Sequence, residues 1–227
     1  MSVRLFLIEL HFPAWARRRM FRRLVAVTAS AFGASVPDVD RLPEAQAVAG
    51  FARFTRAESE RVMENGAGEE PVRDRLREGA REMGRSARRI LGVSSARDVM
   101  RALRVLYSAV GIDFEGSAPT GDATIHRCAF SSEYAPATCR FMAALDEGMA
   151  EGISGGSRLV FTSRMTEGAP CCRATLSRPG PAAPEDARDL SGGGQVPQVS
   201  DSRPPVGSGF APEQDAPVHE PTPERGQ

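Results

Sequence analysis

The spacing of apolar residues changes near Gly111, and this change sets the fold class that the chain can adopt. Before Gly111, apolar side chains recur every three or four residues, which is the period of an amphipathic α-helix. After Gly111 the period approaches two, which is typical of strands with one buried face. Helices followed by short strands predict an α+β fold, with N-terminal helices and a small antiparallel sheet.

Four helices are expected in the first half of the chain. The first begins after Pro13 and ends near Gly33, and the second covers residues 42–63. The third is the clearest, because one continuous apolar stripe runs along it; the stripe comprises Val72, Leu76, Ala80, Met83, Ala87 and Ile90. Ser95 and Asp98 form a capping-box pattern at the start of the fourth.

The second half of the chain predicts two strands, then a helix that covers the sheet, and then a hairpin. The turn of the hairpin contains Gly168, a residue that adopts positive φ without strain. The expected elements cover, in order, residues 112–115, 123–130, 136–151, 157–165 and 171–177.

Composition divides the chain into three parts. Residues 1–110 form the helical region and residues 111–178 the α+β region, and we expect both in one globular unit. Proline, glycine and serine dominate residues 179–227, where few large apolar side chains are available to offset the entropy of ordering. This last part is predicted to be a disordered tail.

Charge and hydropathy limit the kind of partner. The N-terminal apolar run is too short for a membrane span or a secretory signal, so we expect a cytoplasmic protein without a membrane partner. The 29 basic residues balance 29 acidic ones, which gives no overall field that favours nucleic acid. Arginines cluster at residues 17–23 and 73–104. Each cluster is interpreted either as a solvated helix face or as a surface that binds phosphate or a partner. The sequence leaves open whether the chain forms a homodimer.

Several side chains with chemical potential fall on inward faces of the expected elements. Alternation sends Cys172 inward, and it places His126 and Cys128 on one strand face, roughly 7 Å apart. Cys139 and Asp146 share a helix face that is expected to cover the sheet. Because a buried carboxylate is costly without a partner, Asp146 should meet an arginine, a histidine, a metal or a ligand.

Each of these residues also has a purely structural interpretation. An inward cysteine is commonly an inert apolar side chain, and His126 is commonly a hydrogen-bonded or half-exposed residue. Asp146 can lie at the helix edge in water. The sequence contains no C-x-x-C pair and no glycine-rich nucleotide loop, so we expect no metal and no cofactor.

Three segments carry the candidate residues: HRCAFSSEY at 126–134, ALDEGMAEGI at 144–153 and MTEGAPCCRATL at 165–176. Together they resemble the C-terminal part of the L-2-amino-thiazoline-4-carboxylic acid hydrolase family. The resemblance implies a hydrolase that opens a cyclic amidine. It implies Cys128 or Cys172 as the nucleophile, which requires a lowered thiol pKa, and Asp146 as the base or the partner of the amidinium.

Opening a cyclic amidine also needs an acid that protonates the leaving atom and a cation for the carboxylate. His126 would move the proton to the leaving atom, and Arg164 or Arg140 would bind the carboxylate of the substrate. No cofactor is implied.

The final strand also resembles four-vinyl-reductase-type sensor domains, which implies a small-molecule-binding domain without catalysis. Some of these domains hold zinc through cysteines and a glutamate. Cys139 and Cys172 match two such positions, but Phe161 and Arg164 stand near the others, so we expect no zinc or a degenerate site. A structural relative that lacks either function is the third alternative.

Overall fold

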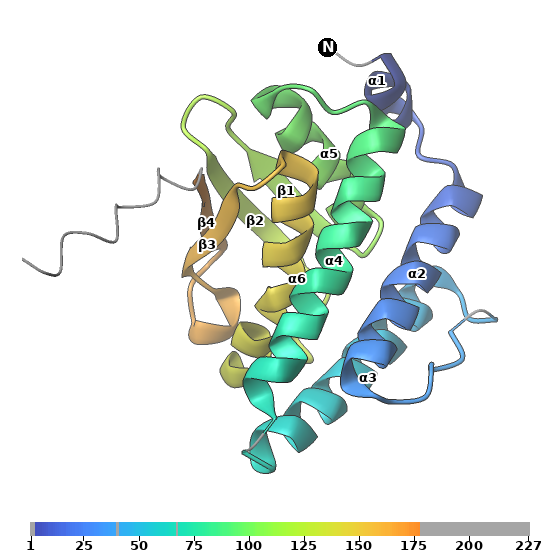
Figure 1. The fold of residues 1–227 in the computed structure, drawn as a ribbon, viewed down its shortest axis with the longest axis vertical. Helices are drawn as coiled ribbons and strands as arrows, with labels where there is room; N and C mark the ends of the chain where they lie inside the picture. The colour runs from blue at the N-terminus through green and yellow to red at the C-terminus, as the bar shows by residue number, and fades with distance from the viewer. Residues whose placement is uncertain (1–2, 40, 67, 178–227) are drawn as a thin grey trace, which may run out of the picture. The chain divides into compact units, whose positions relative to one another are not determined.

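The computed structural model describes residues 3–39, 41–66 and 68–177 and confirms the α+β class. Within these residues, six helices accompany one four-stranded antiparallel sheet (Figure 1). They all belong to one compact unit. The expected tail, residues 179–227, lies outside the described residues.

The helices follow the signals in the sequence closely, apart from α1. They are α1 Val3–Leu10, α2 Ala14–Phe32, α3 Glu44–Glu64, α4 Glu69–Leu91, α5 Ala96–Ser108 and α6 Pro136–Ser154. Gly33 ends α2 at φ 67°, and the Ser95 hydroxyl accepts the Asp98 backbone N–H at 3.2 Å to cap α5. Helix α1 was not predicted, because its eight residues are held by long-range contacts: Leu5 is buried, and Glu9 pairs with Arg101 of α5.

The sheet has the strand order β1-β2-β4-β3. Its strands are β1 Ile112–Gly116, β2 Asp122–Cys128, β3 Arg158–Ser163 and β4 Cys172–Ser177. Alternation holds on the inward face, where the buried residues are Ile112, Phe114, Ala123, Ile125, Leu159, Cys172 and Ala174. Both α5 and α6 pack on the sheet. The turn before β4 contains Gly168 at φ 91°, as expected.

A β-bulge at His126 corrects the predicted face of β2. Asp113 pairs with Arg127, and Phe114 pairs with Ile125, so β2 has one residue more than β1 in this stretch. Alternation therefore reverses beyond the bulge. Cys128 points to the helices, and His126 is exposed, so the expectation that these two share a face is wrong.

One hydrophobic core joins the helices to the sheet. It contains Phe51 of α3, Leu103 of α5, Ile153 of α6 and Cys172 of β4. A smaller cluster around Leu76 lies among α2, α3, α4 and α6. Within the described residues, no helix combines the length and apolar content that crossing a membrane requires.

Helices α4 and α6 pack with their backbones in contact. A Cβ atom on Gly148 would lie 2.0 Å from the Arg77 carbonyl oxygen, and one on Gly152 would lie 2.1 Å from that of Arg81. Only glycine permits so close an approach, which accounts for two glycines inside one helix despite their cost of about 1 kcal/mol each.

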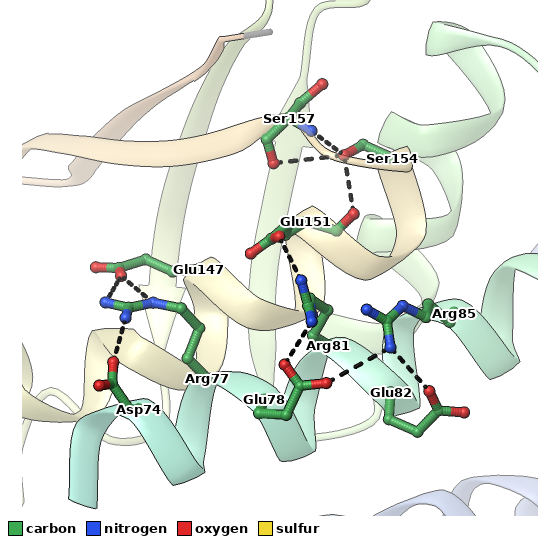
Figure 2. Close-up of polar contacts among 10 residues, drawn as sticks. All are labelled: Asp74, Arg77, Glu78, Arg81, Glu82, Arg85, Glu147, Glu151, Ser154 and Ser157. Atoms are coloured by element: carbon green, nitrogen blue, oxygen red, sulfur yellow. Dashed lines mark hydrogen bonds and ion pairs between the residues drawn. The ribbon is translucent and has the colours of Figure 1, made fainter. Parts of the chain in front are cut away.

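This approach brings the second arginine cluster against the acidic side chains of α6. Arg77 Nη2 lies 2.9 Å from Glu147 Oε2, and Arg81 Nη1 lies 3.1 Å from Glu151 Oε1 (Figure 2). Arg81 and Arg85 also pair with glutamates of α4 itself, as Figure 2 shows. Arg77 and Arg81 are thus engaged in structural ion pairs between two packed helices, whereas Arg85 pairs within α4.

Candidate functional site

A cavity of about 130 Å³ lies between the helices and the inward face of the sheet. Eight of its 23 lining residues carry sulfur, including three of the four cysteines and five of the eight methionines; these are Cys128, Cys139, Cys172, Met20, Met83, Met142, Met149 and Met165. Aromatic rings from several elements complete the wall. The cavity is therefore largely apolar, with a lining that is polarisable and adaptable in shape.

Asp146 is the acidic side chain of this cavity, and α6 directs it there. Gly148, two residues further on, lies on the opposite side of α6 against α4, so the glycine contact fixes the side of the helix that faces the cavity. The Tyr107 hydroxyl of α5 donates a hydrogen bond to Asp146 Oδ1 at 2.8 Å. The second oxygen, Oδ2, receives no hydrogen bond from any described residue.

Burial changes the acidity of this carboxyl. Protein atoms surround Asp146 on all sides, although it keeps some accessible surface because it borders the cavity. Desolvation raises its pKa from 3.8 to about 6, against the opposing effects of the Tyr107 hydrogen bond and the Arg164 charge. The carboxyl therefore changes its protonation state near neutral pH.

Arg164 brings a positive charge to the same cavity. Its guanidinium stacks on the Phe161 ring at 4.3 Å from the centroid, and Nη1 lies 3.9 Å from Cys139 Sγ. It forms no ion pair with Asp146. A carboxylate and a guanidinium thus border one hollow without neutralising each other directly.

Cys128 and Cys172 both line the cavity, where burial makes their thiols less acidic. Burial raises the pKa of Cys128 to about 12, despite a hydrogen bond from the Phe130 backbone. Burial also raises the pKa of Cys172, although Met165 N donates to its sulfur at 3.3 Å. Both side chains are therefore neutral thiols at neutral pH, whereas a nucleophilic cysteine needs a lowered pKa.

Two of the predicted site residues lie elsewhere. His126 is exposed at the bulge and pairs with Glu115 at 3.0 Å, outside the cavity wall. Arg140 forms an exposed ion pair with Glu167 at 2.5 Å and does not line the cavity either. Neither side chain reaches the group of Cys128, Asp146 and Cys172.

Sequence reasoning missed the two tyrosines, which are the only ones in the chain. Both line the cavity, Tyr107 against Asp146 and Tyr134 with its hydroxyl 2.5 Å from the Thr55 hydroxyl. A signal was present for Tyr107, because it lies in the apolar second half of α5, and a buried phenol needs a hydrogen-bond partner.

The size and donors of the site limit what it can hold. A dry cavity of about 150 Å³ accommodates benzene, so this hollow suits a ligand with a single small ring. Across residues 3–177, gaps at 40 and 67 excepted, no three His, Cys, Asp or Glu side chains are arranged to hold a metal ion. The polar groups available to a ligand are mainly the Asp146 carboxyl, the Arg164 guanidinium and the neutral thiols.

Comparison with known proteins found no relative of this chain. The chain matches no protein-family model, no curated protein and no solved structure.

Proposed function

We propose that the cavity binds a small cyclic amidine that carries a carboxylate, and that Asp146 acts as the base in the hydrolysis of its ring. The observation that carries this proposal is the placement of Asp146 and Arg164 on one cavity wall without an ion pair between them. A zwitterionic ring with an amidinium at one end and a carboxylate at the other complements these two charges.

The binding step uses both charged groups. The amidinium donates to the free oxygen of Asp146, while Tyr107 holds the other oxygen in place. The carboxylate of the ligand pairs with Arg164, whose guanidinium plane is already oriented on Phe161. The apolar wall packs on the ring.

In the reaction step, water replaces the thiol as the attacking group. Asp146, with a pKa of about 6, takes a proton from a water that adds to the amidine carbon. The ring carbon–nitrogen bond then breaks as the carbonyl forms, and the two protons of the water end on the released nitrogen. One water is consumed, and Asp146 returns to its starting state.

The test is an assay for ring opening of 2-amino-thiazoline-4-carboxylate, with product identified by mass spectrometry. We expect turnover by the wild-type chain and a loss of at least about 100-fold in Asp146→Asn, the range for removal of a general base. Cys172→Ser should keep its activity within a few-fold, and Arg140→Gln serves as a matched control outside the cavity. Unchanged turnover in Asp146→Asn would remove this residue from the mechanism.

A second function, ligand binding without catalysis, is favoured by the neutral thiols. A wall of protonated cysteines and methionines supplies packing for a ligand but no activated nucleophile. In that case the same amidine should raise the melting temperature of the protein without any product. Stabilisation together with product would favour the hydrolase.

A further inference from the structure

The first helix presents an apolar face to solvent. Leu5 is buried and Glu9 pairs with Arg101, so α1 has a fixed orientation on α5. Its outer side carries Phe6, Leu7 and Leu10, which are 47%, 57% and 76% exposed. With Trp15, at 71%, this short segment holds half of the eight exposed large apolar side chains of the described residues. Such an exposed cluster marks an interaction surface.

The next helix continues this surface with positive charge. Trp15, Arg18, Arg19 and Arg22 follow the spacing i, i+3, i+4, i+7 along α2, and all four are exposed. The other two arginines of the cluster turn elsewhere: Arg17 pairs with Glu44 at 3.4 Å, and Arg23 donates to the Ser86 hydroxyl. Arg17 and Arg23 thus make internal contacts, whereas Arg18 and Arg19 lie exposed on α2.

The two helices that carry these side chains follow each other directly in the chain. Residues 11–13 are the whole connection between α1 and α2, and Figure 1 shows α2 beginning beside the end of α1. We call Phe6, Leu7, Leu10, Trp15, Arg18 and Arg19 the N-terminal surface. No described residue forms an ion pair with Arg18 or Arg19, in contrast to the α4 arginines.

We propose that the N-terminal surface binds an anionic lipid bilayer from one side. Exposed aliphatic and aromatic side chains beside arginines have the composition of a helix that lies in the headgroup region, where tryptophan prefers the interface and arginines pair with lipid phosphates. A second copy of the chain fits less well, because a two-fold contact on this surface would bring arginines of both copies together. This inference is independent of the cavity and of its ligand.

We expected no membrane partner, and no helix of the described residues is long and apolar enough to cross a bilayer. That expectation rested on the absence of a long apolar run, whereas contact with one leaflet needs only a few exposed apolar side chains and nearby positive charge. One arginine close to an anionic surface strengthens binding by roughly fivefold, so Arg18 and Arg19 together contribute about 25-fold. The attachment is reversible and weakens with salt.

The experiment is co-sedimentation of the full chain with vesicles of phosphatidylcholine, with and without phosphatidylglycerol. We expect binding to the phosphatidylglycerol vesicles, loss of at least about tenfold in Leu7→Asp/Leu10→Asp, and a similar loss in Arg18→Glu/Arg19→Glu. Matched controls on the sheet are Val160→Asp for an exposed apolar residue and Arg127→Glu/Arg158→Glu for charge reversal; they should bind like wild type.

Thermal unfolding of every variant checks that the fold is retained. The proposal is overturned if phosphatidylglycerol does not increase the co-sedimentation of the wild-type chain with vesicles. It is overturned as well if the sheet variants lose binding as strongly as the variants of the N-terminal surface. It is also overturned if sedimentation equilibrium shows a dimer that Leu7→Asp/Leu10→Asp dissociates, because the surface would then be covered by a second copy.

Discussion

Asp146 is held in a state that costs stability at neutral pH. Its pKa in the folded protein, about 6, exceeds the ordinary value of 3.8 because burial disfavours the charged form. The folded state therefore binds the proton more tightly than the unfolded chain. Protonated Asp146 leaves stability unaffected below pH 3.8, and the penalty grows as the pH rises from 3.8 to 6, reaching about 3 kcal/mol above that range.

Replacement of this carboxyl should accordingly stabilise the protein. Asp146→Asn keeps an acceptor for the Tyr107 hydroxyl but cannot ionise, so its free energy of unfolding should exceed that of wild type at neutral pH by as much as about 3 kcal/mol. The difference should vanish near pH 4 in urea unfolding curves. The exposed Asp113→Asn should change stability by less than about 0.5 kcal/mol throughout. A destabilised Asp146→Asn at neutral pH would contradict this account of the buried carboxyl.

Among the elements, the contact between α4 and α6 orients the cavity wall. Gly148 and Gly152 let the backbones touch, and the arginine–glutamate pairs flank this contact (Figure 2). The opposite side of α6 then presents Asp146 to the cavity, while α4 contributes Met83 to the wall.

An added methyl group at this contact should separate the two helices. Gly148→Ala places a Cβ 2.0 Å from the Arg77 carbonyl oxygen, and we expect a loss of roughly 3 kcal/mol in the free energy of unfolding. Gly50→Ala is the matched control inside α3, where a Cβ meets only Leu42 Cδ1 at 4.0 Å. It should stabilise by up to about 1 kcal/mol, because alanine favours helix. Equal stability of both variants in urea unfolding would show that the helices do not need this close approach.

Periodicity was sufficient to predict most of the helices and strands. Five helices and four strands lie close to their expected bounds, because each has a buried face with a regular repeat and a local end signal such as Gly33 or Ser95. Helix α1 has no such local signal and depends on Leu5 and Glu9 meeting α5. Only the tertiary structure supplies that contact.

Alternation predicted part of the lining of the candidate cavity. Helical and strand alternation brought Asp146 and Cys172 to one cavity, and Cys128 joined them by a different route, because the bulge at His126 reversed the face of β2. No rule of alternation predicts a bulge from sequence alone. The raised pKa values of the Cys128 and Cys172 thiols depend on burial by elements that are distant in the sequence. No local pattern around either cysteine predicts this burial.

Asp146 and Arg164 line the same cavity without an ion pair between them, and we propose that they receive the two charged ends of one small ring. The decisive experiment is calorimetric titration with 2-amino-thiazoline-4-carboxylate. We expect one ligand per chain, at least about tenfold weaker binding in Asp146→Asn and in Arg164→Gln, unchanged binding in Arg140→Gln, and an affinity that falls as the pH drops below about 6. No binding by the wild-type chain, or equal binding by all four proteins, would contradict the claim.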